Sequence, residues 1–325
     1  MAAMMMHNIY KALGLSVIVA GAAATAVSAG DVSEVPLPGD RAFPESVAAA
    51  SDGTLYVSSI ASGGVWRIKP GSGTAEEWVK PGAFGSRVTL GVNVDEKQKI
   101  VWVCSNDMSA LGVPGPSDVK GAHLLGFDLA TGEGKVSTTF PGEKNFCNDT
   151  AIGADGTLYI ANSASPQILT LKPGSSNLEV WLESKDFEQP ADGGAGLDGI
   201  AFGADGNLYL NTFATGLFFR VDVKDGKPGK VTKLTPSRAL KNPDGLRPTG
   251  GNTFVMAEGG GTVDRVTIKG DDVEIETIKE LPLGPTGVMP VGDKIWVTEG
   301  QLSHLFNAKS GPPHLPFRVL SIPAK

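Results

Sequence analysis

Residues 148–160 read NDTAIGADGTLYI, and residues 198–210 read DGIAFGADGNLYL. Both segments hold a small polar turn followed by a short apolar strand, and the same pattern returns six times along the chain. The strands that follow the six turns are residues 55–57, 101–103, 158–160, 208–210, 253–255 and 295–297. Repetition of one short unit predicts a repeat architecture in place of a single layered domain.

Each repeat contains further short strand patterns, separated by turn signals such as Pro70-Gly71 and Gly270-Asp271. Helical periodicity is nearly absent, so the repeats are typical of four-stranded antiparallel blades. The sequence therefore predicts an all-β fold, a six-bladed β-propeller that occupies residues 30–325 as a single domain. In the sixth repeat, the third and fourth strands are expected at residues 304–308 and 317–322.

A ring of blades has to be closed, because an open edge strand invites pairing with other chains. Residues 32–38 resemble an outer strand without a blade of its own, and pairing with the sixth blade would join the two ends of the chain. Residues 317–322 compete for the same outer place, and the sequence leaves that choice open.

The composition is that of a globular, acidic protein. Of 325 residues, 41% are hydrophobic and 19% are charged, and 28 Lys and Arg against 35 Asp and Glu give a net charge of −7. There is no basic stripe, so nucleic acids and anionic membrane surfaces are poor partners. A small molecule is the expected partner, and the oligomeric state stays open.

Residues 1–29 have the pattern of a secretory signal peptide. Lys11 precedes an apolar run over residues 12–26, and Val27-Ser28-Ala29 provides small residues for cleavage. The alternative, a membrane anchor, is disfavoured because the apolar run is short for a span. We therefore expect a secreted or periplasmic protein that has no membrane contact after cleavage.

The chain has two cysteines, Cys104 and Cys147, and export would permit them to form a disulfide. Cys104 closes the inner strand pair of the second repeat, and Cys147 immediately precedes the first strand of the third. In a ring these positions lie on the same face of neighbouring blades. A Cys104–Cys147 bridge is the preferred interpretation, with two buried thiols as the alternative.

An oxygen-bearing side chain recurs seven residues before the turn aspartate or its equivalent. The aligned residues are Glu45, Asn148, Asp198, Asp244 and Thr286, and Leu90 aligns in the second repeat. Equivalent positions of a ring converge on one axis, so Glu45, Asn148, Asp198 and Asp244 are candidate ligands of a divalent cation. Calcium is preferred because all the donors are oxygen atoms, whereas zinc favours His and Cys. The alternative is that these side chains bond backbone amides at the top of the channel.

Polar residues also recur where inner strands end, and these are candidate substrate contacts. They are Asn162, Asn211, Glu258 and Glu299. Two long segments, residues 108–121 and 184–196, interrupt the repeat rhythm and either shape a binding site or decorate the surface. A solvated rim is the alternative for the four polar residues.

Short motifs around the aligned positions resemble the SMP-30/gluconolactonase/LRE-like family. They are Pro44-Glu45, Asn148-Asp149, Leu197-Asp198-Gly199 and Asn242-Pro243-Asp244-Gly245. The resemblance implies a six-bladed propeller with a divalent cation at its axis, and commonly lactonase or related hydrolase activity. It also implies that Glu45, Asp198 and Asp244 bind the metal, with Asn148 as ligand or substrate contact.

The chain departs from the family pattern at two positions. Asp198 stands where the family often has Asn, which makes the site more negative. Phe146 stands where the sugar-lactone enzymes often have Arg, so Phe146 is a candidate substrate contact for a more apolar lactone or ester.

These observations predict an exported, metal-dependent lactonase or esterase. Asp244 is the first candidate for the catalytic base that activates water, with Glu258 and Glu299 as alternatives. Two other functions stay open: a non-catalytic propeller that binds a ligand or a protein around a structural ion, and a lyase or isomerase that uses the same metal. Fold alone does not choose among them.

Overall fold

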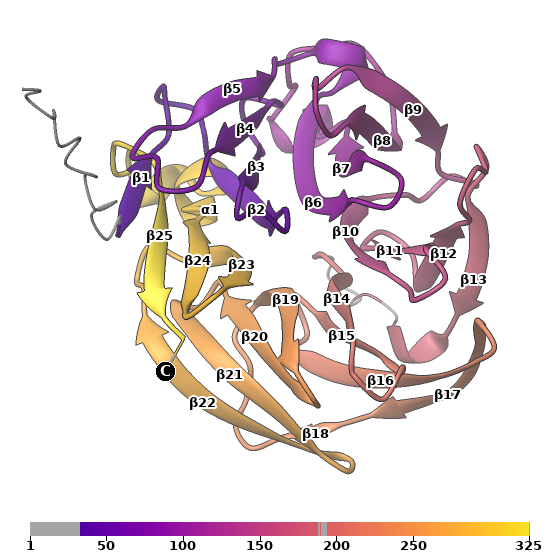
Figure 1. Ribbon diagram of the computed structural model, residues 1–325. Helices are drawn as coiled ribbons and strands as arrows, with labels where there is room; N and C mark the ends of the chain where they lie inside the picture. The colour runs from indigo at the N-terminus through magenta and orange to yellow at the C-terminus, as the bar shows by residue number, and fades with distance from the viewer. Residues whose placement is uncertain (1–32, 188, 190–193, 325) are drawn as a thin grey trace, which may run out of the picture. The chain divides into compact units, whose positions relative to one another are not determined.

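The computed structural model describes residues 33–187, 189 and 194–324, and its strands form six antiparallel sheets arranged as the blades of a propeller (Figure 1). The predicted signal peptide, residues 1–29, lies outside the described residues. None of the helices within the described ranges is long and apolar enough to cross a membrane.

The first three blades follow the repeats in chain order. Blade 1 contains β2 (Pro44–Ala49), β3 (Leu55–Ser59), β4 (Val65–Ile68) and β5 (Glu76–Val79). Blade 2 contains β6 (Val88–Asp95), β7 (Ile100–Asn106), β8 (Ala122–Asp128) and β9 (Gly134–Thr139). Blade 3 contains β10 (Cys147–Ile152), β11 (Leu158–Asn162), β12 (Gln167–Leu171) and β13 (Glu179–Glu183).

The last three blades complete the ring. Blade 4 contains β14 (Leu197–Phe202), β15 (Leu208–Thr212), β16 (Leu217–Lys224) and β17 (Lys227–Lys233). Blade 5 contains β19 (Pro243–Gly250), β20 (Thr253–Glu258), β21 (Thr262–Lys269) and β22 (Asp272–Glu280), with the short β18 (Thr235–Pro236) at its edge. Blade 6 contains β23 (Pro285–Val291), β24 (Lys294–Glu299), β25 (Arg318–Pro323) and β1 (Glu34–Pro36).

The ring closes through both ends of the chain. The N-terminal β1 pairs antiparallel with β25, with Val35 opposite Val319, so β25 is the third strand of blade 6 and β1 the fourth. Both segments that the sequence offered for the outer strand, residues 32–38 and 317–322, therefore contribute a strand to blade 6. Innermost strands β23 and β2 pack on each other, as do all neighbouring innermost strands around the ring (Figure 1).

The prediction of a strand at residues 304–308 is wrong. This stretch belongs to a helical connection between β24 and β25, made of α1 (Leu302–Phe306) and the 3-10 turn η4 (Ala308–Ser310). Leu302 and Phe306 are four residues apart, a spacing that places both on one face of a helical turn. The Gln301 side chain fixes the connection through two hydrogen bonds with the His314 backbone. It donates to the His314 carbonyl at 2.9 Å and accepts from the His314 amide at 2.7 Å.

Three further 3-10 turns lie in loops between strands: η1 (Ala83–Gly85), η2 (Ser109–Leu111) and η3 (Lys185–Phe187). Aromatic rings from the second strands pack between blades. Tyr159 of blade 3 meets Phe202 of blade 4 with ring centroids 5.0 Å apart, and Tyr209 meets Phe254 of blade 5 at 5.1 Å. Such pairs contribute about 0.5–1.5 kcal/mol each beyond their buried area, which helps hold neighbouring blades together.

Candidate metal centre

The pairing between the first and second strands breaks at the same place in all six blades. Two residues of each first strand are skipped there, which is a β-bulge. The first skipped residues are Glu45, Leu90, Asn148, Asp198, Asp244 and Thr286. These are the six positions that the sequence repeat aligns. The bulge therefore gives each of these side chains the same place in its blade.

Glycine at the second bulge position lets the innermost strands approach each other closely. The six residues there are Ser46, Gly91, Asp149, Gly199, Gly245 and Gly287. A Cβ atom on Gly199 would lie 2.2 Å from the carbonyl oxygen of Asp244, and one on Gly91 would lie 2.3 Å from that of Asn148. These separations are too short for a side chain, so the approach depends on glycine.

Side chains of the second strands clamp these bulges to the next blade. Asn211 accepts from the Gly199 amide at 3.0 Å and donates to the Asp244 carbonyl at 2.8 Å. Thr298 accepts from the Gly287 amide at 2.7 Å and donates to the Glu45 carbonyl at 2.9 Å. The backbone of two candidate ligands is thus fixed by hydrogen bonds that cross between blades.

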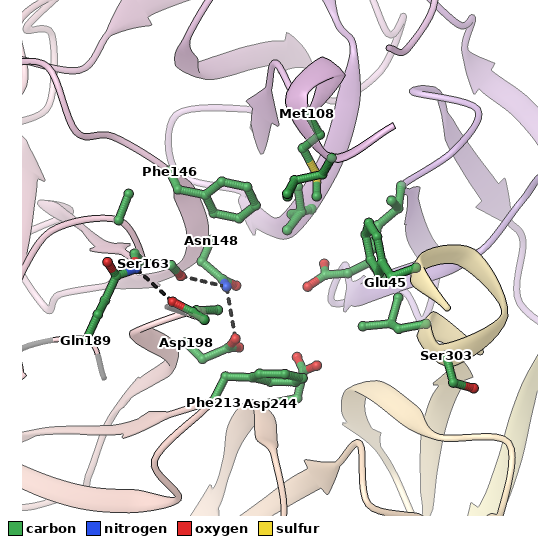
Figure 2. Close-up of a pocket in the computed structure, with 18 residues that line it drawn as sticks. Glu45, Met108, Phe146, Asn148, Ser163, Gln189, Asp198, Phe213, Asp244 and Ser303 are labelled. Carbon is green, nitrogen blue, oxygen red and sulfur yellow. Dashed lines mark hydrogen bonds between the residues drawn. The ribbon is translucent and has the colours of Figure 1, made fainter. Parts of the chain in front are cut away.

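All four predicted ligands line one cavity of about 680 Å³. Glu45, Asn148, Asp198 and Asp244 lie around its polar part, with Glu45 facing the other three (Figure 2). Thr286 takes no part in the lining, because its hydroxyl donates to the Pro44 carbonyl at 3.1 Å. Residues far apart in sequence therefore meet where the repeat predicts.

Asn148 connects two of the site residues through its amide group. Its Nδ2 donates to Asp198 Oδ2 and to Ser163 Oγ, both at 2.9 Å (Figure 2). Ser163 was not singled out from the sequence, since a serine after a strand is an ordinary turn residue. Among the described residues that line the cavity, three buried oxygen atoms have no hydrogen-bond partner: Glu45 Oε2, Asn148 Oδ1 and Asp198 Oδ1.

Burial makes the three carboxyl groups hard to ionise together. It raises the pKa of Asp198 to about 7, and the charge of Asp149 adds to the effect. Burial likewise raises the pKa of Glu45 and of Asp244 well above the ordinary carboxyl range, with the charge of Asp198 as the next cause in both cases. The Asp198 and Asp244 carboxyls lie close enough for each to shift the pKa of the other.

This donor set fits a hard cation. The three unpartnered oxygen atoms are acceptors only, and such atoms are the ligands that Ca²⁺ takes. No His or Cys is among the described residues that line the cavity, so zinc is a poor match. In the described ranges, no three His, Cys, Asp or Glu side chains lie close enough together to hold an ion as they are placed. The candidate ligands would therefore have to move closer to one another to bind a cation.

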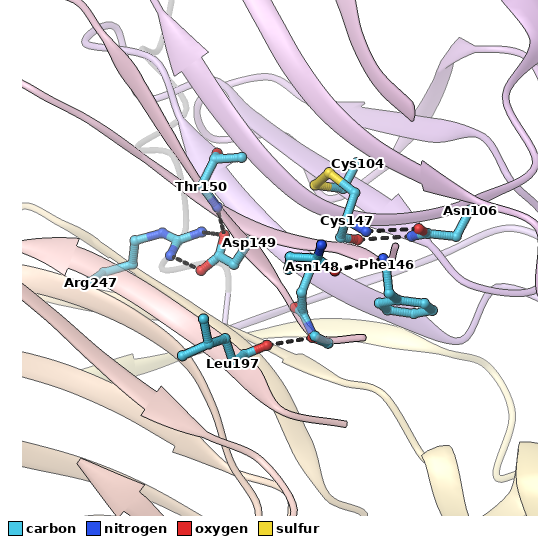
Figure 3. Close-up of a disulfide and its surroundings, with 11 residues drawn as sticks. Cys104, Asn106, Phe146, Cys147, Asn148, Asp149, Thr150, Leu197 and Arg247 are labelled. Atoms are coloured by element: carbon cyan, nitrogen blue, oxygen red, sulfur yellow. Dashed lines mark hydrogen bonds and ion pairs between the residues drawn. A yellow bond between two sulfur atoms is a disulfide. The ribbon is translucent and has the colours of Figure 1, made fainter. Parts of the chain in front are cut away.

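A buried ion pair lies next to the candidate ligands, formed by Asp149, which follows Asn148, and Arg247. The Arg247 guanidinium donates to both carboxylate oxygens of Asp149, at 2.6 and 2.9 Å, and joins blades 5 and 3 (Figure 3). Sequence reasoning did not find Arg247, although Asp149 was part of a quoted motif. Its charge lowers the pKa of Glu45 in partial opposition to burial.

The predicted disulfide between Cys104 and Cys147 is confirmed, with Cα atoms 5.1 Å apart. It joins blade 2 to the start of β10, directly before Asn148 (Figure 3). Asn106 supports the same junction, because its side chain accepts from the Cys147 amide at 2.9 Å and donates to the Cys147 carbonyl at 2.8 Å. The backbone that carries Asn148 is therefore held from the neighbouring blade.

The predicted substrate contacts separate into two groups. Phe146 lines the cavity, whereas Asn162, Asn211, Glu258 and Glu299 are absent from its described lining. Asn162 accepts from the Phe146 amide at 2.9 Å, and Asn211 forms the clamp between blades 4 and 5.

The two glutamates are committed to ion pairs. Glu258 pairs with Arg238 at 2.7 Å, and Glu299 pairs with Arg318 at 2.8 Å. Both are buried, so each carboxylate already has a positive partner within the blade. The structure does not bring either one to the cavity.

Three long connections build the cavity walls. The loop after β7 contributes Met108 and Leu111, and the connection before β14 contributes Gln189. The third is the helical connection with Leu302 and Phe306, of which residues 304–308 were predicted to be a strand. Both long segments noted in the sequence thus reach the site.

Buried Arg87 fixes the loop after β7. Its guanidinium donates to the carbonyls of Pro114 and Val119 and to Ser109 Oγ, and pairs with Asp107 at 2.9 Å. Because the Arg87 guanidinium bonds four residues of the loop, and charge-assisted hydrogen bonds are strong, the loop has a defined shape.

The sequence model of the SMP-30/gluconolactonase/LRE-like region matches residues 43–292. No curated protein matches the chain. Among solved structures, a gluconolactonase from Xanthomonas campestris is similar over 86% of this chain and 90% of its own, with 18% identity and a TM-score of 0.63.

Two other similar structures have different descriptions. A calcium-binding regucalcin from Agrobacterium tumefaciens is 19% identical over 90% of this chain and 95% of its own, with a TM-score of 0.61. Virginiamycin B lyase from Staphylococcus aureus is 16% identical over 89% of this chain and 83% of its own, with a TM-score of 0.60. At such identities the likeness shows the fold, and it does not choose an activity.

The raised carboxyl pKa values predict how stability depends on pH. In calcium-free buffer, the folded protein holds the Asp198 proton more tightly than the unfolded chain, so its free energy of unfolding falls as pH rises from about 4 to about 7. Asp198→Asn removes this group. At pH 8 the free energy of unfolding of the variant should exceed that of the wild type by at most about 4 kcal/mol, because each unit of pKa shift is worth about 1.4 kcal/mol. Urea unfolding between pH 4 and 9 measures the difference.

The matched control for this substitution is Asp293→Asn, at an exposed turn. It should leave the pH dependence of the wild type unchanged. Equal stability curves for the Asp198→Asn variant and the wild type would contradict the assignment of a costly buried charge at the axis.

The close approach of the innermost strands gives a second prediction. Gly199→Ala places a Cβ 2.2 Å from the Asp244 carbonyl, so blades 4 and 5 must separate. We expect a loss of about 1–3 kcal/mol in the free energy of unfolding, as for other overpacked sites. Gly73→Ala, where nothing lies within 4 Å, is the control and should change stability by less than about 0.5 kcal/mol. Equal effects of the two alanines would refute the packing role.

Proposed function

The chain belongs to the SMP-30/gluconolactonase/LRE-like family, and from this membership and its axial side chains we propose that it is a metal-dependent hydrolase of a small lactone or ester. The observation that carries the proposal is the set of buried, unpartnered oxygen atoms on Glu45, Asn148 and Asp198 at the polar end of the cavity. Buried carboxylates without a counter-charge are costly, so a site of this kind is built for a positive ligand.

The proposed ligand is a divalent cation, with Ca²⁺ as the best match to oxygen donors. Glu45, Asn148, Asp198 and Asp244 would hold it. The calcium-binding description of the similar regucalcin supports this assignment. Bound there, the cation would polarise the substrate carbonyl and stabilise the oxyanion that forms when water attacks.

The chain's own residues supply the positioning and the proton transfer. Asn148 holds the Asp198 carboxylate through its amide, so both side chains keep one orientation. Asp244 accepts a proton from the attacking water as the new carbon–oxygen bond forms, and returns it to the departing alkoxide when the ester bond breaks. Glu258 and Glu299 do not compete for this role, because their carboxylates are paired with arginines outside the cavity lining.

The cavity lining favours a substrate less polar than a sugar lactone. Phe146, Phe213 and Leu90 line the cavity, and no Lys or Arg is among the described lining residues. A sugar would need hydrogen-bond partners for several hydroxyl groups, and burying those hydroxyls against apolar walls is unfavourable.

The test is hydrolysis of a panel of lactones and aryl esters by the mature protein. We expect activity to be lost with EDTA and to return with Ca²⁺. Asp244→Asn should lower kcat by about 10²–10⁴-fold, the usual contribution of a general base, while circular dichroism shows a retained fold. Asp293→Asn is the matched control and should keep full activity.

Other outcomes would support the competing functions. Folded, Ca²⁺-loaded protein without turnover on any substrate would favour a non-catalytic binding propeller with a structural ion. Products of elimination in place of water addition would favour a lyase, the activity of one structurally similar protein. Activity that withstands both EDTA and Asp244→Asn would contradict the proposed chemistry.

We further propose that the protein acts outside the cytoplasm, either secreted or in the periplasm. The signal pattern at residues 1–29 supports export, and the Cys104–Cys147 disulfide suits an oxidising compartment. Expression with the native N-terminus should give an exported chain that begins near residue 30, as measured by intact mass. A full-length chain confined to the cytoplasm would contradict this placement.

A further inference from the structure

The mouth of the cavity has apolar walls on two sides. Met108 and Leu111 come from the loop after β7, and Leu302 and Phe306 come from α1. The two pairs come from segments nearly 200 residues apart in sequence, and all four side chains line the same cavity as the axial carboxylates. Figure 2 shows Met108 on a different side of the polar centre from Ser303, the neighbour of Leu302 in α1.

The exposure of these walls is informative. Leu111 is 62% exposed and Phe306 is 44% exposed, and both belong to the small set of large hydrophobic side chains that the described chain leaves open to water. Exposed apolar residues scattered singly are ordinary, but those gathered at a cavity mark a binding surface. These two flank the entrance to the axial site.

A buried polar side chain fixes the connection that carries each wall. Buried Arg87 fixes the loop that carries Met108 and Leu111. Buried Gln301 fixes the connection that carries Leu302 and Phe306, through its two hydrogen bonds with His314. Walls on connections fixed in this way suit a largely preformed site, as small-molecule pockets usually are.

We infer that the substrate carries an unbranched hydrocarbon arm that lies between these two walls. The inference rests on the proposed function, since the arm extends from a lactone or ester group placed at Asp198 and Asp244. A polar end that binds the reacting group and an apolar mouth that binds the rest match an amphiphilic molecule. Leu111 and Phe306 are then the residues that determine specificity, because they add apolar contact where the cavity opens to water.

The test measures binding apart from turnover. A series of γ-lactones with side chains from methyl to octyl is titrated calorimetrically into Ca²⁺-loaded Asp244→Asn protein, which lacks the proposed base. We expect Kd to fall about 4-fold per methylene, corresponding to about 0.8 kcal/mol per buried CH₂, until the arm extends beyond the walls.

Phe306→Ala and Leu111→Ala should flatten this dependence for the longer arms and leave the methyl lactone unchanged. Both residues are exposed, so the fold should tolerate the substitutions. Val180→Ala is the matched control, because Val180 is 45% exposed on the outer strand β13 and does not line the cavity.

The result separates this inference from the proposed function. A steep length dependence in the Asp244→Asn variant, together with a Ca²⁺-loaded wild type that hydrolyses none of these lactones, would keep the apolar-arm site and reject the hydrolase. Hydrolysis with a Kd independent of arm length would keep the hydrolase and overturn the inference. A flattening by Val180→Ala equal to that by Phe306→Ala, or no lactone binding at all, would also overturn it.

Discussion

Contact between the innermost strands, made at one bulge in each of the six blades, is the constraint on which the site depends. The bulge turns its first residue towards the axis, and its second residue has to be small where the next blade's carbonyl comes close. Gly199 and Gly91 meet that demand, with Asp244 and Asn148 carbonyls inside the space of a Cβ. Side-chain clamps such as Asn211, which joins blades 4 and 5, and Thr298, which joins blades 6 and 1, add hydrogen bonds across these contacts. The packing of the innermost strands therefore determines where the axial side chains lie.

The same packing creates an electrostatic problem at the axis. Glu45, Asp198 and Asp244 are buried together, and Asp149 is close enough to raise the pKa of Asp198 further. Arg247 neutralises Asp149 through two hydrogen bonds, but the other three carboxyls have no cationic partner among the described residues. Burial raises the pKa of all three and disfavours their ionised forms. A protein that keeps such a cluster has given up stability for binding or catalysis, a common trade at functional sites.

The fold and the axial residues were predictable because they repeat. A recurring turn and strand fixes the blade, and residues at one offset from the turn share one place in the ring, so Glu45, Asn148, Asp198 and Asp244 meet as expected. Residues 304–308 were misassigned because a five-residue run with an apolar centre, HLFNA, fits a strand as well as a helical turn. The partners of Asn211, Glu258 and Glu299 were missed for another reason: a polar residue at a strand end does not reveal whether its partner is solvent, substrate or a neighbouring backbone. Arg87 and Arg247 act across blades, and their partners are set by the ring and not by local pattern.

The central claim is that the axial side chains bind one divalent cation. The most direct measurement is anomalous diffraction from crystals grown with Ca²⁺. The account predicts one anomalous peak at the polar end of the cavity, bounded by oxygen atoms of Glu45, Asn148, Asp198 and Asp244. A Ca²⁺-saturated crystal with no peak at this position, and with the carboxyl groups instead bonded to one another or to water, would contradict it.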